Sequence, residues 1–320
     1  MKHRLPILPA IVLGIVGAVA AGVFLARHRH GDAAGNAAAR GDAPAATGAA
    51  LPPSHRENLV PAPRADEIIG QAARQLASHD SVSAKINLHS ELFGESLTAL
   101  GQYLQGPADT RKMRLELKLK LGEKVCSLQQ VSDGAGVWTL QTTIKQSRLG
   151  RVDLPRALAA MQQSGFRAGI DVLALGGLSV LLDSLNRSFE FQSMRSEKLG
   201  VTPTYVVLGV WKPEALARLM AGEESAGEAA TPPEPAALPV YLPNQIEIYI
   251  GRDDLFPYQV DYLRAAAPGK RRDSDRLLAR MKLVDVHFNA PIDAGQFTNP
   301  GGNTIPIDDT EAYLRRVIKR

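Results

Sequence analysis

The side chains that could carry out chemistry in this chain are few, and the histidines come first. His89 lies two residues before Glu91, and His287 lies two residues after Asp285. Both pairs fall in segments of alternating polarity, where residues two apart share one face of a strand. A metal site needs further ligands, and no spacing in the sequence supplies them. We therefore interpret both pairs as solvated histidine–carboxylate neighbours.

A carboxylate pair and a single thiol complete the candidates. Asp253 and Asp254 lie in "GRDDLFP" between two apolar alternating runs, which favours a hairpin turn over an acid–base pair. Cys126 is the only cysteine, so no intramolecular disulfide can form, and its place in "KVCSLQQV" is typical of a small buried apolar residue. The sequence contains no GxSxG elbow, HExxH motif or glycine-rich phosphate loop. We expect a protein that is not an enzyme, with no catalytic residue, no metal and no cofactor.

The elements that would position a site begin with a strand of unusual regularity. In "RKMRLELKLKLGEK" the residues Met113, Leu115, Leu117, Leu119 and Leu121 occupy one parity, and charged residues occupy the other. Because side chains alternate across a strand, this pattern predicts a half-buried β-strand with one apolar face. That face covers either an ordinary core or a cavity for an apolar ligand.

Similar patterns recur along the chain. A helix is predicted over 64–79, and further helices begin at Asp153, after the Gly176-Gly177 break and at Pro213. About ten strands are predicted, joined mostly by short turns as antiparallel neighbours: 82–93, 96–105, 111–121, 124–132, 136–145, 189–195, 203–211, 244–251, 257–265 and 277–289. The fold class is therefore α+β and mainly antiparallel β. A sheet of this size curls, and helices must cover its concave apolar face.

The N-terminal segment carries the membrane signal. Residues 5–26 follow a short basic tail, 1–4, and read "LPILPAIVLGIVGAVAAGVFLA" without a charge. As a helix they would extend about 33 Å, enough for a ~30 Å hydrocarbon core. A cleaved signal peptide is the alternative, with a site at Ala18-Val19-Ala20. Apolar residues continue past that site, which favours an uncleaved transmembrane signal anchor.

Composition marks two segments that cannot bury enough apolar surface to fold. Residues 27–63 are rich in Ala, Gly and Pro and predict a disordered linker, and about 222–239 predicts a disordered insertion in the domain 64–320. Across the chain, aromatic residues make up 5% and the net charge is +4, without a basic stripe interleaved with aromatics. This composition argues against a nucleic-acid partner.

Four stretches resemble a known family: "LGGLSVLLDSLNRSFEF" (175–191), "YVVLGVWKPEALARL" (205–219), "LPNQIEIYIGRDDLFPYQVDYLR" (242–264) and "MKLVDVHFNAPIDAGQFTNPGG" (281–302). Over residues 64–310 the chain resembles the LolA/LolB-like lipoprotein-localisation-factor superfamily, and in particular its uncharacterised membrane-anchored bacterial members. The resemblance implies a half-open β-barrel whose concave face is closed by helices. It also implies that acyl chains bind in a hydrophobic cavity.

We therefore expect a non-catalytic module that binds a lipid or the acyl chain of a lipoprotein. A single N-terminal helix would hold it in the cytoplasmic (inner) membrane, with the globular domain in the periplasm. The alternative is an interaction scaffold of the cell envelope, with a filled core, no ligand and a protein partner. The expected cavity-lining residues are Met113, Leu115, Leu117, Leu119, Leu181, Leu182, Ile246, Ile248 and Ile250.

Overall fold

The computed structural model describes residues 63–92, 95–121, 124–164, 172–220, 238–239, 241–265 and 275–318. The predicted basic tail, membrane anchor and linker therefore lie outside the described residues, apart from Pro63, and so does the predicted insertion as far as residue 237. Among the described helices, none combines the length and the apolar character that crossing a membrane requires.

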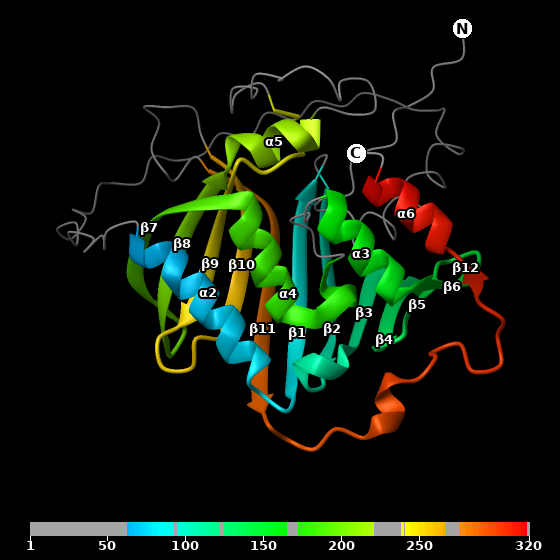
Figure 1. Ribbon diagram of the computed structural model, residues 1–320. Coiled ribbons are helices and arrows are strands. Elements are labelled where there is room, and N and C mark those ends of the chain that lie inside the picture. Colours follow the sequence, from blue (N-terminus) through cyan, green and yellow to red (C-terminus); the bar gives the residue numbers. More distant parts are fainter. Residues whose placement is uncertain are drawn as a thin grey trace, which may run out of the picture.

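A single twelve-stranded sheet forms the frame of the domain (Figure 1). Its order is β12-β6-β5-β4-β3-β2-β1-β11-β10-β9-β8-β7. Neighbouring strands are antiparallel except β12, which pairs parallel to β6. The strands are β1 (Val82–Leu92), β2 (Glu95–Gln105), β3 (Lys112–Leu121), β4 (Lys124–Asp133), β5 (Gly136–Thr142), β6 (Ser147–Asp153), β7 (Phe189–Leu199), β8 (Thr202–Trp211), β9 (Gln245–Gly251), β10 (Pro257–Arg264), β11 (Arg276–Phe288) and β12 (Ile307–Asp308).

The sheet consists of two meanders joined at one seam. Strands β1–β6 pair with their sequence neighbours, and so do β7–β11. Pairing of β1 with β11 joins the two halves and places Val82 opposite Phe288 and Ser90 opposite Ala279. The sheet curls without closing, because β7 and β12 lie at opposite edges.

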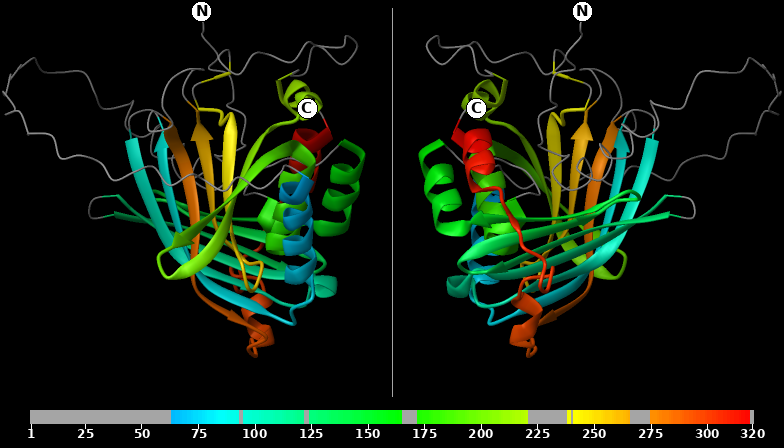
Figure 2. Two further views of the ribbon diagram at one scale, coloured as in Figure 1. Left: turned by 90° about the vertical axis from the view of Figure 1, so that its left-hand side faces the viewer. Right: turned by 90° about the vertical axis from the view of Figure 1, so that its right-hand side faces the viewer.

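Helices gather on the concave side of the curled sheet (Figure 2). Helix α4 packs against α2 and against β3, β4 and β7, while α6 packs on α3. The helices are α2 (Pro63–Ala77), α3 (Leu154–Ser164), α4 (Leu173–Ser188), α5 (Pro213–Met220) and α6 (Thr310–Ile318), with short 3-10 turns η1 (Ala108–Thr110) and η6 (Ala294–Phe297). The predicted fold class is confirmed: an α+β domain built on an unclosed, mainly antiparallel sheet with a helical layer.

The strand count differs from the prediction of about ten. The predicted strand 136–145 ends at Thr142, and the chain turns back into β6, whose sequence "SRLGRVD" has too little alternation to be recognised. Strand β12 has only two residues, and its pairing with β6 depends on the distant course of the chain. The predicted cap at Asp153 is confirmed, because its Oδ1 accepts the Arg156 N–H at 2.9 Å.

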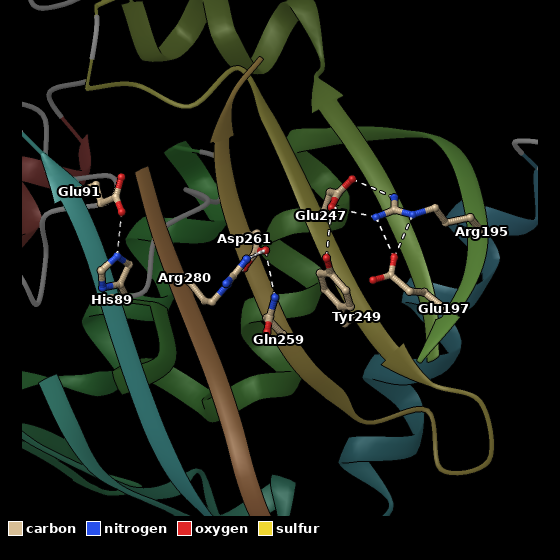
Figure 3. A network of polar contacts seen from close by, with 9 residues as sticks. All are labelled: His89, Glu91, Arg195, Glu197, Glu247, Tyr249, Gln259, Asp261 and Arg280. Carbon is tan, nitrogen blue, oxygen red and sulfur yellow. Dashed lines mark hydrogen bonds and ion pairs between the residues drawn. The ribbon is translucent and has the colours of Figure 1, made fainter. Parts of the chain in front are cut away.

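The convex face of the second meander is covered by a layer of charged pairs (Figure 3). Arg195 on β7 donates two hydrogen bonds to Glu247 on β9, at 2.9 and 3.2 Å. Both side chains are largely buried, with 15% and 12% of their surface exposed. Burial opposes the charge of Arg195, but the hydrogen bonds and charge of Glu247 outweigh it and raise the pKa of the guanidinium. This pair crosses β8 and ties three strands together.

A second pair ties β10 to β11. Arg280 donates to both carboxylate oxygens of Asp261, at 2.8 and 2.6 Å, and Gln259 donates to the same carboxylate at 3.0 Å. The Asp261 side chain is only 3% exposed, whereas that of Arg280 is 41% exposed. Removing the guanidinium would leave a buried carboxylate with one neutral donor.

We predict that Arg280→Met lowers the free energy of unfolding by about 2 kcal/mol, because a buried charge loses its partner. Lys85→Met is the matched control, since Lys85 pairs with Asp285 on the neighbouring strands but both side chains are more than half exposed. This control should unfold as the wild type does. Urea denaturation followed by circular dichroism measures both. Equal midpoints for the two variants would contradict a structural role for the Asp261 pair.

Candidate ligand-binding site

The nine predicted cavity-lining residues come together in one apolar cluster under the helical layer. Strand β3 contributes four of them, strand β9 three and helix α4 two. Their exposed fractions run from 0 to 5%: Met113, Leu115, Leu117, Leu119, Leu181, Leu182, Ile246, Ile248 and Ile250. The sequence pattern thus located the concave apolar face, and the binding of a ligand there stays a prediction.

In the described arrangement, protein side chains fill the space in front of these residues. A side chain that borders a void large enough for water retains accessible surface, and most of these retain none. Leu178, Leu181, Leu182 and Leu185 of α4 are all fully buried in the same cluster. An apolar ligand can reach the concave face only if helix α4 or its neighbours move.

Helix α4 is interrupted near its start by two glycines. Gly176 has φ 175° and ψ 18°, and Gly177 has φ 77° and ψ −162°, so the helical hydrogen-bond ladder breaks there. The left-handed φ of Gly177 favours glycine over any other residue. The break leaves the N–H of Leu178 without a helical carbonyl to accept its hydrogen bond.

Two polar side chains of strand β2 satisfy this buried N–H. The Leu178 N–H donates to the hydroxyl of Tyr103 at 2.9 Å and to Oε1 of Gln105 at 3.3 Å. The Tyr103 hydroxyl in turn donates to the same Gln105 oxygen. We call Tyr103 and Gln105 the β2 polar pair. They attach the broken end of α4 to the concave face of the sheet.

Burial controls the chemistry of the β2 polar pair. Tyr103 is fully buried, which raises the pKa of its hydroxyl well above the usual range, although the Leu178 N–H opposes the shift. The hydroxyl therefore stays neutral and can both donate and accept. Gln105 is 3% exposed, and its Nε2 finds no hydrogen-bond partner among the described residues. A buried amide left half satisfied costs free energy and weakens this attachment.

Sequence reasoning missed the β2 polar pair. Tyr103 and Gln105 share a parity with Leu97, Ala99 and Gly101, so they lie on the core-facing side of β2. A glutamine at a core-facing position was the available signal. Its partner on α4 could not be read from the pattern, because the contact joins residues more than seventy positions apart.

The prediction of solvated histidine–carboxylate neighbours is confirmed for His89 with Glu91 but not for His287 with Asp285. His89 Nε2 lies 3.1 Å from Glu91 Oε1, and their side chains are 32% and 50% exposed. Asp285 pairs instead with Lys85, at 2.6 Å. Within the described ranges, no three His, Cys, Asp or Glu side chains are grouped closely enough to hold a metal ion.

The remaining candidates also have structural roles. Asp254 forms the predicted hairpin turn, because its Oδ1 accepts the Phe256 N–H at 2.9 Å and its Oδ2 accepts the Tyr258 hydroxyl at 2.5 Å. Cys126 is fully buried in the core cluster and is a free thiol. Both interpretations from the sequence are confirmed.

The packing of Leu117 distinguishes a filled core from a wet cavity. If Leu117 lined a hydrated cavity, as the sequence-based hypothesis has it, Leu117→Gln would lower the free energy of unfolding by only about 1 kcal/mol and would reduce lipid uptake. The new amide would keep its hydrogen bonds to water. Leu117 is 2% exposed in the core cluster, so we expect the larger cost of a buried amide, about 3 kcal/mol. Thermal and urea unfolding of Leu117→Gln measure it. A loss near 1 kcal/mol would show that water reaches the concave face.

We predict that Tyr103→Phe lowers the free energy of unfolding by about 1–3 kcal/mol, because the buried Leu178 N–H loses its better acceptor. Hydrogen exchange at the Leu178 amide should accelerate. Tyr205→Phe is the matched control: its ring stacks on Arg252 at 5.3 Å, and no hydrogen bond of its hydroxyl is present in the described part of the chain. Unchanged exchange at Leu178 in Tyr103→Phe would contradict the attachment.

Comparison with known proteins gives likeness in structure only. No protein-family model matches the chain, and no curated protein matches it. A LolA superfamily protein from Nitrosomonas europaea matches 75% of this chain and 98% of its own, at 10% identity and a TM-score of 0.29. The lipoprotein LppX from Mycobacterium tuberculosis matches 72% of this chain and 98% of its own, at 12% identity and a TM-score of 0.35. LprF from Mycobacterium bovis matches 75% of this chain and 98% of its own, also at 12% identity and a TM-score of 0.35.

These matches include the superfamily that the sequence resembles. The described domain itself is an unclosed, curled, mainly antiparallel sheet with helices on the concave face. At such identities and TM-scores, the matches assign no activity, ligand or partner to this chain.

Proposed function

We propose that the domain is a non-catalytic binding module for an apolar ligand, a lipid or the acyl chain of a lipoprotein, which enters between the sheet and helix α4. The proposal includes a tether: residues 5–26 anchor the chain in the inner membrane, and 27–63 link the anchor to a domain in the periplasm. The tether rests on the sequence pattern alone.

One observation carries the binding proposal. On the concave face, apolar side chains of β3, β9 and α4 belong to one buried core cluster, and the broken end of α4 is attached through the β2 polar pair. Gln105 satisfies only part of its hydrogen-bonding capacity there. An element that covers a large apolar face, has a glycine break and is held by an incompletely satisfied polar contact is suited to move as a cover.

The free-energy cost of lifting α4 and the free energy gained by burying an acyl chain in its place are of similar size. Lifting α4 exposes its buried leucines, at about 1.5–3 kcal/mol for each side chain. An acyl chain of a dozen methylenes gains about 10 kcal/mol when it replaces them against the sheet. The leucines themselves can cover part of the bound chain, which reduces the cost. Ligand binding therefore does not require a cavity in the unliganded protein.

The filled core equally supports the second candidate, an envelope scaffold without a ligand. Here the domain would present a sheet edge or the segment 223–239 to a partner protein, and α4 would stay in place. Deleting 223–237, which keeps the buried Leu238 in place, would abolish partner binding in a scaffold and leave the uptake of an apolar ligand intact. The two functions thus differ in whether α4 must move.

We predict that Gly177→Ala weakens the cover and increases apolar-ligand uptake at a given ligand concentration. A Cβ at this position would lie 2.3 Å from Gln105 Oε1 and 2.6 Å from the Tyr103 hydroxyl, so α4 must shift away from the β2 polar pair. Gly200→Ala is the matched control. Its φ of 66° is similarly left-handed, but nothing lies within 4 Å of its added Cβ.

Backbone strain should lower the free energy of unfolding of both variants by about 1 kcal/mol, and the clash should lower that of Gly177→Ala further. Uptake is measured with a fluorescent fatty acid, and native mass spectrometry of the gently purified full chain detects lipid that copurifies. Increased uptake in Gly177→Ala alone supports the cover. An absence of fatty-acid binding and of copurifying lipid in all three proteins would contradict ligand binding and favour the scaffold.

A further inference from the structure

A surface hollow lies apart from the concave core, at the end of the sheet where three connections meet. These are the link from α2 to β1, the link from β2 to β3 and the segment that follows β11. The hollow has a volume of about 310 Å³, at the lower end of the range for small-molecule sites. Residues from all three connections line it, among them Asp80, Pro107, Lys112, Asn289, Ile292 and Phe297.

Hydrogen bonds between distant segments hold the walls of this hollow in place. The Asn289 N–H donates to the Ser81 carbonyl at 2.9 Å, and the Asp80 N–H donates to Asn289 Oδ1 at 2.9 Å. The Ser81 hydroxyl donates to the Ala290 carbonyl at 2.5 Å. Asn289 adopts a left-handed φ of 57°, a conformation that asparagine tolerates better than most non-glycine residues.

Hydrogen bonds also hold the β2–β3 connection and η6 in place. The Gly106 N–H donates to the Lys112 carbonyl at 2.9 Å, which closes the β2–β3 connection. Arg114 donates to the Gln296 carbonyl at 3.2 Å and holds η6 against β3. The hollow is therefore formed before any ligand binds, so ordering its walls would add little to the free-energy cost of binding.

Two opposite charges share this hollow without pairing. The Asp80 carboxylate and the Lys112 ammonium both belong to lining residues, and they form no ion pair with each other or with any residue in the described ranges. Pro107, Ile292 and the buried Phe297 supply apolar surface beside them. An acidic residue, a basic residue and apolar surface thus line one hollow of about 310 Å³.

We propose that this hollow binds a small zwitterion whose ammonium and carboxylate are joined by an apolar body, namely a free apolar amino acid or dipeptide. The Lys112 ammonium pairs with the carboxylate of the ligand, and the Asp80 carboxylate pairs with its ammonium. The apolar body rests against Phe297, Pro107 and Ile292. This site is separate from the concave core and does not depend on acyl-chain binding.

The probes are leucyl-leucine and its two singly blocked analogues, N-acetylated and C-amidated. Binding to the full chain in lipid nanodiscs is measured by saturation-transfer NMR, with empty nanodiscs as the blank. We expect the dipeptide to bind and each blocked analogue to bind about ten-fold more weakly, because each lacks one charged contact. Free leucine tests whether a single residue is sufficient.

Two variants assign the charges. Lys112→Met should weaken dipeptide binding about ten-fold and leave binding of the C-amidated analogue unchanged. Asp80→Asn should likewise weaken dipeptide binding about ten-fold and leave binding of the N-acetylated analogue unchanged. Lys120→Met, an exposed position on the same strand outside the hollow, is the control and should change nothing. The proposal is overturned if the wild type gives no signal, if both blocked analogues bind as well as the dipeptide, or if dipeptide binding survives in both variants.

Discussion

Exclusion of water from the concave face of the sheet is the constraint on which the rest of the structure depends. An unclosed sheet of twelve strands cannot bury that face against itself, so the chain covers it with α2, α4 and α3. A straight helix cannot follow a curled sheet along its length, and α4 is interrupted at Gly176 and Gly177. The interruption frees the Leu178 N–H inside an apolar core, where only a polar side chain from the sheet can satisfy it.

The two faces of the sheet thus handle polar groups in different ways. On the convex side, Arg195 with Glu247 and Arg280 with Asp261 form charged pairs that cross neighbouring strands and keep the long side chains flat on the sheet. On the concave side the β2 polar pair is neutral and incompletely satisfied. The convex contacts link neighbouring strands of the second meander through charged groups, whereas the concave contact leaves Gln105 Nε2 without a hydrogen-bond partner among the described residues.

Alternation along single strands was sufficient to predict the fold class and the concave apolar face, because parity alone decides which side of a strand a residue occupies. This is why the Leu115–Leu119 face and the isoleucines of β9 were located correctly. The β2 polar pair, the convex ion pairs and the hollow beside Lys112 were not predicted. Each depends on the register of strands or loops that are far apart in the sequence, such as Asp80 beside Asn289. Periodicity contains no information about that register.

The seam between β1 and β11 has a consequence for how the chain is made. The first meander can pair its six strands once residue 153 has been synthesised, but the outer edge of β1 has no partner until residues 276–288 follow. During that interval a long strand presents free N–H and C=O groups to any extended chain nearby. Closure over such a sequence distance is slow compared with the pairing of hairpins. A chain that paired its first meander before β11 was made would therefore expose this edge to misassociation until β11 arrived.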